Sequence, residues 1–237
     1  PDFVPASLLR KLQLDRLQAI VAHATERVEL FRQRMQSRKL TPADIRTLDD
    51  VARQPFTSKS ELRVTYPFGL FAVPLRDVVR LHASSGTTGK PIVVAYTKQD
   101  VEVWTSVMVR SLAACGLHEG DIVQNAYGYG LFTGGLGAHY GAEGIGAAVI
   151  PISGGNTDRQ IMVLKDFSAT AICCTPTYFL QLIDRAAQLA PTYLCERQSR
   201  GSSGPWSFGD RVKQMLTIFG KKPILGIGID ERDEMRT

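Results

Sequence analysis

Residues 84–91 read Ser-Ser-Gly-Thr-Thr-Gly-Lys-Pro, a stretch of hydroxyls and glycines that ends in a lysine and a proline. Glycine reaches positive φ angles and lets the backbone approach a ligand closely. Successive backbone N–H groups in such a turn form an anion-binding nest, and hydroxyl and ammonium groups add donors. The stretch therefore predicts a phosphate-binding loop formed by Ser84, Ser85, Gly86, Thr87, Thr88, Gly89 and Lys90.

This loop differs from a Walker A motif, which is Gly-x4-Gly-Lys-Ser/Thr followed by a helix. Ser84 stands at the first glycine position, and Pro91 follows the lysine. The apolar runs 78–82 and 92–96 read as strands, so the loop is predicted to join strand to strand without help from a helix N-terminus. A kinase or GTPase of the P-loop type is therefore disfavoured. A polar hairpin turn without a ligand stays open as an alternative.

The loop resembles the phosphate loop of adenylate-forming enzymes, the acyl-CoA synthetases and their relatives. Four further segments are similar to the phenylacetate–CoA ligase branch, at residues 55–63, 66–74, 125–135 and 153–157. The motifs keep one register from about residue 8 to about residue 189. The resemblance implies an α/β fold, the N-terminal part of the large domain of such an enzyme, with the small C-terminal domain absent.

The resemblance also implies a two-step reaction with an aryl acid, ATP, Mg²⁺ and CoA. The carboxylate attacks the α-phosphorus of ATP to give acyl-AMP and pyrophosphate, and the CoA thiol then displaces AMP. Residues 84–90 would bind the β- and γ-phosphates, and Lys59 would reach the acid-binding pocket unless it is an ordinary surface lysine. The ring pocket would be lined by Tyr127, Gly130, Phe132 and Ala138, and a nucleotide loop would comprise Ser153, Gly154, Gly155, Asn156 and Thr157.

The residue types at 127–132 predict a pocket independently of the resemblance. They follow a predicted strand at 122–126, and open α/β sheets place ligands at the carboxyl ends of their strands. Aromatic residues interleaved with glycines there suit a flat apolar slot for an aromatic ring. Aromatics that merely pack in the core are the alternative. The Gly128-x-Gly130 pair lacks the later glycine and the acidic residue of a dinucleotide fingerprint.

The rest of the chain alternates between predicted helices and strands. Helices are predicted over 6–36, 134–146, 157–167 and from Pro176, with Asn156 or Thr157 as a cap, and strands over 147–152 and 169–175. The glycines within 134–146 predict a helix packed closely on the sheet, and His139 within it is read as a packed or hydrogen-bonded residue. These patterns divide the chain into a helical segment 1–75, an α/β core 76–190 and a tail 191–237.

Composition and charge narrow the classes of partner. The chain is 44% hydrophobic and 22% charged, with a net charge of +5 from dispersed basic residues. This suits an anionic small molecule better than nucleic acid, which we do not expect as a partner. The four cysteines lack Cys-x2-Cys spacing, and Cys173 and Cys174 read as buried thiols. No apolar run approaches the roughly 18 residues of a membrane span and no signal peptide is apparent, so we expect a cytoplasmic protein without membrane contact.

Beyond residue 190 the likeness to the ligases fades. Ser202 and Ser203 stand where the family has Ala and Glu before Pro-Trp, and residues 226–231 do not match its aromatic-Gly-x-x-Glu motif. No metal ligand or catalytic residue can be assigned, since the family's catalytic lysine lies in the small domain. We hypothesise reading-frame shifts near Tyr193 and near Phe219, which translation of the other frames tests. A genuinely diverged tail is the alternative.

The sequence thus favours a phenylacetate–CoA ligase-like protein, an AMP-forming acid–thiol ligase. A non-catalytic remnant that still binds nucleotide or aryl acid is the competing hypothesis, because the downstream motifs are missing. Members of the branch lead us to expect a homodimer.

Overall fold

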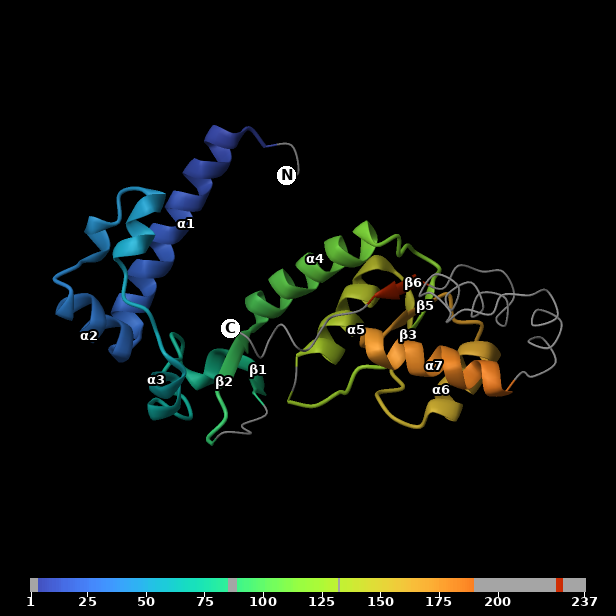
Figure 1. Ribbon diagram of the computed structural model, residues 1–237. Coiled ribbons are helices and arrows are strands. Elements are labelled where there is room, and N and C mark those ends of the chain that lie inside the picture. The colour runs from blue at the N-terminus through green and yellow to red at the C-terminus, as the bar shows by residue number, and fades with distance from the viewer. Residues whose placement is uncertain (1–3, 85–88, 132, 190–224, 228–237) are drawn as a thin grey trace, which may run out of the picture. The chain divides into compact units, whose positions relative to one another are not determined.

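The computed structural model describes residues 4–84, 89–131, 133–189 and 225–227. The chain divides into two compact units, Pro1–Gln99 and Asp100–Thr237 (Figure 1). The division falls in the first turn of helix α4 (Lys98–Ala114). The strands on either side of the predicted phosphate loop therefore belong to the same unit as the N-terminal helices.

The N-terminal unit begins with helices α1 (Ala6–Arg27) and α2 (Glu29–Ser37). The prediction of one continuous helix over 6–36 is wrong because Val28 adopts an extended backbone, with φ −110° and ψ 109°. Its side chain is 8% exposed, so burial accompanies the break. The break lets α2 pack on α1, and a small core forms from Val21, Met35, Leu40 and Ile45.

Short capped turns follow these two helices. They are η1 (Pro42–Asp44), η2 (Leu48–Arg53), α3 (Lys59–Val64) and η3 (Leu75–Asp77). The first of these, η1, is a single 3-10 turn after Thr41, and α3 begins after Ser58. In η2 the backbone N–H groups of Arg46 and Thr47 donate to Asp50 and hold the pKa of its carboxyl below the usual range. Capping boxes thus account for where η1, η2 and α3 begin.

Strands β1 (Val78–Ala83) and β2 (Val93–Thr97) form an antiparallel hairpin. The prediction that residues 84–91 join strand to strand is confirmed. His82 is 2% exposed, and its ring lies edge-on to Tyr96 at 5.6 Å between centroids. The hairpin therefore places the loop beyond one end of a two-stranded sheet.

The second unit is built on a four-stranded sheet with the order β4-β3-β5-β6. Its strands are β3 (Ile122–Asn125), β4 (Ala148–Ile150), β5 (Ala171–Cys173) and β6 (Leu225–Ile227). All three pairings are parallel, which confirms the predicted α/β sheet. The connecting helices are α5 (Gly134–Ile145), α6 (Thr157–Asp166) and α7 (Pro176–Leu189).

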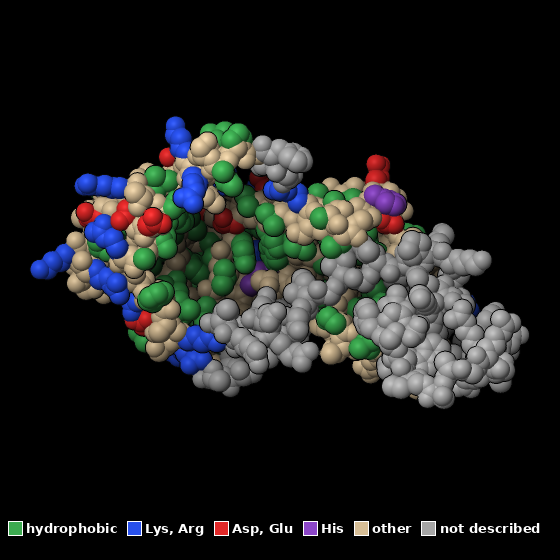
Figure 2. Space-filling view, turned by 45° about the horizontal axis from the view of Figure 1, so that its top comes forward, with side chains coloured by type: hydrophobic (Ala, Val, Ile, Leu, Met, Phe, Trp, Pro, Cys, Tyr) green, Lys and Arg blue, Asp and Glu red, His purple; other side chains and the backbone are tan. Residues whose placement is uncertain are grey.

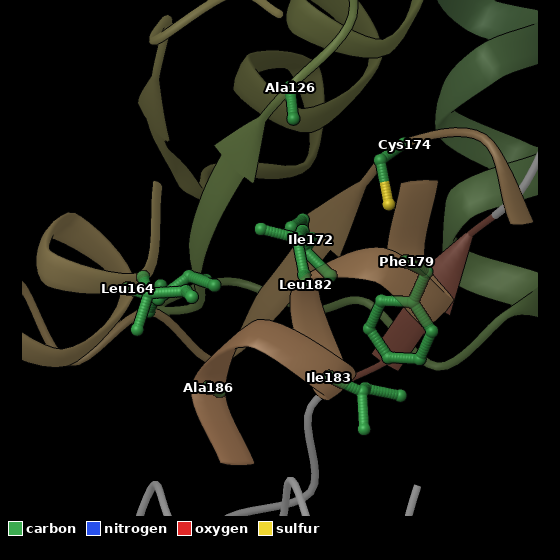
Figure 3. Packing of buried hydrophobic residues seen from close by; sticks show 10 residues of the cluster. Ala126, Leu164, Ile172, Cys174, Phe179, Leu182, Ile183 and Ala186 are labelled. Atoms are coloured by element: carbon green, nitrogen blue, oxygen red, sulfur yellow. The ribbon is translucent and has the colours of Figure 1, made fainter. Parts of the chain in front are cut away.

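Alternate residues of β5 enter two different cores. Ala171 and Cys173 pack with residues of α5, whereas Ile172 and the following Cys174 pack with α6 and α7. Figure 3 shows the second core, where Phe179, Leu182, Ile183 and Ala186 of α7 line one side, the residues predicted for its apolar face. Burial raises the pKa of both Cys173 and Cys174 to about 12. The expected buried thiols are thus confirmed.

The glycines of α5 face another helix and not the sheet. A Cβ added at Gly137 would lie 2.9 Å from Trp104, and one at Gly141 would lie 2.6 Å from the Cβ of Met108. Both partners belong to α4. The predicted helix does pack on the sheet, through alanines of α5 that share a core with residues of the strands. Gly137 and Gly141 instead allow α4 to approach α5 closely.

The surface of the N-terminal unit carries mixed charge. On the face shown in Figure 2, Lys and Arg side chains are interspersed with Asp and Glu at the left of the view. Salt bridges such as Arg27–Glu26 and Arg53–Asp50 lie in this region. Among the helices of the described ranges, none has both the length and the apolar content needed to cross a bilayer.

Candidate functional site

The described ends of the predicted phosphate loop are joined by two hydrogen bonds. The Ser84 N–H donates to the Ile92 carbonyl at 3.0 Å, and the Ile92 N–H donates to the Ser84 hydroxyl at 2.9 Å. Gly89 has φ +136°, and an added Cβ would meet nothing within 4 Å, so conformation and not space requires glycine there. Residues 85–88, which include the other predicted phosphate-binding residues, lie outside the described part of the chain.

Lys90 closes the predicted loop and is exposed. Its Nζ lies 5.4 Å from the centroid of the Tyr66 ring. An ammonium at this distance over an aromatic face is attracted by the ring quadrupole. Because the ring carries no net charge, the Lys90 charge is left to act on an anion.

Lys59 is the exposed first residue of α3. The Ser58 N–H and hydroxyl donate to the Glu61 carboxylate at 2.7 Å and 2.6 Å. Arg34 of α2 also pairs with Glu61 and donates to the Phe56 carbonyl. The start of α3 is thus firmly held, while the predicted contact of Lys59 with an acid stays a prediction.

The predicted ring-pocket residues lie on the segment between β3 and α5 and on α5 itself. Tyr127 is 4% exposed and packs in one hydrophobic cluster with Ala138 and Val123. Gly130 is exposed, with nothing within 4 Å of an added Cβ. Phe132 lies outside the described residues. The structure therefore brings Tyr127 and Ala138 together in the core, and Gly130 lies at the surface of the same segment.

Tyr129 is the polar member of this segment. Its hydroxyl lies 2.7 Å from Asn125 Nδ2 and 3.1 Å from His139 Nδ1, so His139 is hydrogen-bonded as expected. Burial raises the pKa of the Tyr129 hydroxyl, and the neighbouring Cys173 and Glu143 act in the same direction. The phenol therefore stays protonated and can donate a hydrogen bond.

The predicted nucleotide loop has a strained, specific conformation. Ser153, Gly155 and Asn156 have positive φ angles of 65°, 89° and 46°. The Asn156 side-chain oxygen accepts from the Arg159 N–H at 3.1 Å and caps α6, which begins at Thr157. Of the two predicted caps, Asn156 is the one that the structure uses.

This loop lies beside the carboxyl end of β3. The Ser153 N–H donates to the Asn125 carbonyl at 3.2 Å. A Cβ added to Gly154 would lie 3.6 Å from the Ala126 carbonyl. Within the second unit, the predicted nucleotide loop and the β3–α5 segment therefore start from the same end of the sheet, where open α/β sheets bind ligands.

Two buried glutamines support the 153–157 loop, and the sequence analysis did not identify them. The Gln124 amide donates to the backbone and side-chain oxygens of Gln160 at 3.1 Å and 2.6 Å. The Gln160 amide in turn donates to the carbonyls of Ser153 and Gly155 at 2.6 Å and 3.3 Å. Gln124 is 0% exposed. Two adjacent polar residues in the predicted strand, Gln124 and Asn125, were the signal available, because buried polar groups need partners.

Neither a metal site nor a carboxylate cluster forms among the described residues. No group of three or more His, Cys, Asp or Glu side chains within those ranges could hold a metal ion. The donors described at the predicted phosphate loop are a hydroxyl and an ammonium, and an ammonium cannot ligate a cation. The described residues therefore do not identify the ligands of a Mg²⁺ ion, which proteins usually bind through one or two carboxylates together with substrate phosphates.

The fold is similar to that of solved acyl-CoA ligases. A solved 2-hydroxyisobutyryl-CoA ligase, in complex with 2-HIB-AMP and CoA, matches 78% of this chain with a TM-score of 0.74 and 28% identity, over 41% of its own length. No family model matches the chain.

The curated homologues of the chain are phenylacetate-coenzyme A ligases. The one from Thermus thermophilus is 45% identical over 96% of this chain, and the one from Pseudomonas putida is 46% identical over 93%. The chain spans about half the length of these relatives, 53% and 52%. The resemblance predicted from the motifs is therefore confirmed.

The similarity also extends further along the chain than predicted. The matches leave at most 7% of the chain unaligned, since they cover 93–96% of it. The 48 residues after Leu189 are a fifth of its 237 residues, so the matches continue past that point. The C-terminal limit of the similarity was predicted too early because it was based on a few motifs, which end before the overall similarity does.

Proposed function

We propose that this chain forms the ATP- and acid-binding part of a phenylacetate–CoA ligase, which activates an aryl acid to acyl-AMP and then transfers the acyl group to CoA. The observation that carries the proposal is the glycine- and hydroxyl-rich hairpin loop, with Gly89 at positive φ and Lys90 free of carboxylate partners among the described residues. Similarity to phenylacetate-coenzyme A ligases over nearly the whole chain supports the substrate class.

The chain's own residues would act mainly by positioning and by charge. In adenylation the carboxylate is the nucleophile, so the protein must align it with the α-phosphorus and stabilise the charge that develops. We assign residues 84–90 to the β- and γ-phosphates and Lys59 to the carboxylate. Tyr127, Gly130, Phe132 and Ala138 are assigned to the ring, and residues 153–157 to the nucleotide.

ATP and CoA are the co-substrates that this proposal requires. The related 2-hydroxyisobutyryl-CoA ligase structures, in complex with an acyl-AMP and CoA, support that choice. We propose Mg²⁺ only as the companion of the ATP phosphates. The use of ATP and CoA is also the reason for keeping the cytoplasm as the proposed location.

A non-catalytic remnant that binds ATP or aryl acid is the second candidate. The observation that favours it is the tail, where Ser202 and Ser203 replace the expected Ala and Glu. Such a protein would keep its ligands without carrying out adenylation.

Phenylacetate-dependent exchange of labelled pyrophosphate into ATP separates the two candidates. Exchange by the purified chain that is lost in Lys90→Ala and kept in Lys98→Ala supports a working adenylation site. Thermal stabilisation by ATP without exchange supports the remnant. Neither exchange nor stabilisation by either ligand would contradict both candidates.

We also propose a homodimer, by analogy with the branch. Light scattering during gel filtration tests it, with a mass of about twice 26.0 kDa supporting the dimer and 26.0 kDa contradicting it.

A further inference from the structure

Four hydrogen-bonded side chains connect the β3–α5 segment to strand β3 on one side and to helix α5 on the other. Asn125 Nδ2, at the end of β3, lies 2.7 Å from the Tyr129 hydroxyl. That hydroxyl lies 3.1 Å from His139 Nδ1, and His139 Nε2 lies 3.0 Å from a carboxylate oxygen of Glu143. His139 and Glu143 are one turn apart on α5. The tyrosine thus bridges a strand end and a helix.

The described residues on either side of Tyr129 are exposed. Gly128 and Gly130 are exposed and would have nothing within 4 Å of an added Cβ. Leu131 is 64% exposed. Among the described residues of 128–131, the Tyr129 side chain is therefore the anchor that reaches into the protein.

The direction of each hydrogen bond follows from the Asn125 amide. Its Oδ1 accepts from the Tyr127 N–H at 3.3 Å, and its Nδ2 also donates to the Gly135 carbonyl at 2.7 Å. Nδ2 therefore donates to the Tyr129 oxygen. The arrangement that directs the Tyr129 O–H at an acceptor has that O–H donating to His139 Nδ1, with His139 Nε2–H donating to Glu143.

Gly135, at the start of α5, provides a second point of contact with the β3–α5 segment. A Cβ there would lie 2.4 Å from the Gly128 carbonyl, so only glycine allows the segment to lie this close to the helix. The segment is thus held at Gly128 by close contact with the start of α5, and at Tyr129 by the hydrogen-bonded side chains.

We propose that this directional chain, Asn125 to Tyr129 to His139 to Glu143, holds the β3–α5 segment in place and makes Tyr129 a positioning residue for the ring of the acid substrate. The effect on the substrate rests on the proposed function, since it acts through Tyr127, which the same segment carries. The hydrogen-bond chain itself does not depend on that function.

Selective ¹⁵N labelling of the four histidines tests the chain directly. In the wild type we expect the His139 signals to report the Nε2–H form, with His139→Asn identifying them. Tyr129→Phe should shift these signals and speed hydrogen exchange of the Tyr127 amide by about three- to tenfold, the loss expected for one hydrogen bond. A proton on Nδ1 in the wild type, or unchanged exchange in Tyr129→Phe, would overturn the proposal.

Calorimetry with phenylacetate tests the consequence for the substrate. Tyr129→Phe and His139→Leu should each weaken phenylacetate binding about three- to tenfold and leave ATP binding unchanged. His139→Asn, whose amide oxygen can replace Nδ1 as acceptor, should restore most of the affinity, and Tyr140→Phe controls for loss of a phenol on α5. Equal affinity in Tyr129→Phe, or no rescue by asparagine, would overturn the positioning role. A wild type that binds no phenylacetate would overturn the proposed function and this role. The histidine spectra would still test the hydrogen bonds from Asn125 to Glu143, because they do not depend on substrate binding.

Discussion

The two sheets of this protein differ in how completely their strands are covered. In the parallel sheet, β5 is buried throughout, with one core on each side of it. In the hairpin, Val79, Leu81 and Val94 remain 62%, 42% and 44% exposed. Loops that leave the parallel sheet therefore start from a well-packed frame, whereas the predicted phosphate loop starts from two strands with apolar faces in contact with water.

This difference extends to the way each candidate site is supported. The 153–157 loop and the β3–α5 segment are held by buried amides and by Tyr129. The described ends of the phosphate loop are held by the reciprocal Ser84–Ile92 pair and by the Lys90–Tyr66 contact. We expect core substitutions in the parallel sheet to affect stability, and hairpin substitutions to affect mainly ligand binding.

The largest expected effect comes from removing a helix side chain that packs in the core beside the parallel sheet. Leu182→Ala should lower the free energy of unfolding by about 3 kcal/mol, because Leu182 is fully buried in the α7 core and the cavity would be filled only in part. Val79→Ala in the hairpin should change it by less than about 0.5 kcal/mol. Urea denaturation of the two variants measures both changes in the free energy of unfolding. Equal losses would contradict the difference in coverage between the two sheets.

A smaller loss is expected where α5 approaches α4. At Gly141 an added Cβ would lie 2.6 Å from the Cβ of Met108, so Gly141→Ala must push the helices apart. We expect a net loss of about 1–2 kcal/mol in unfolding free energy, after the gain in helix propensity. Gly128→Ala, which meets nothing within 4 Å, is the matched control. Stabilisation in Gly141→Ala would contradict the close packing.

The buried thiols give a pH-dependent effect of similar or smaller size. Burial raises the pKa of Cys173 to about 12, so the folded state keeps the thiol protonated after the unfolded chain begins to ionise near 9. Its contribution is thus constant below pH 9 and is lost as the pH rises above it. At pH 10 the wild type should have lost about 1 kcal/mol more than Cys173→Ala, relative to pH 8. Denaturation at the two pH values checks this, and parallel losses would show that the thiol is not shielded.

Sequence patterns predicted the second unit better than the first. Apolar runs and helical patterns located β3 to β5 and α7, because these elements bury most of their apolar residues. The break at Val28 was missed since the apolar pattern continues across it, and only the packing of Met35 on Val21 requires the turn. The packing of α5 on the sheet was predicted, but the approach of α4 to Gly137 and Gly141 was not, because a row of small residues shows that something approaches closely but not which element does.

The candidate site was predictable as a set of motifs but not as a set of contacts. The hairpin loop, the cap at Asn156 and the hydrogen-bonded His139 all followed from local chemistry. The burial of Tyr127 and the support from Gln124 and Gln160 depend on residues distant in sequence, brought together only by the sheet. Local sequence patterns do not indicate which distant residues become partners.

Calorimetric titration with ATP tests the central claim, that the hairpin loop binds the triphosphate. We predict measurable binding by the wild type that weakens by at least about tenfold in Lys90→Ala, because a charge-assisted hydrogen bond to phosphate is lost. Lys98→Ala, which removes a lysine of α4 outside the loop, should bind like the wild type. Equal ATP affinity in wild type and Lys90→Ala would contradict the account.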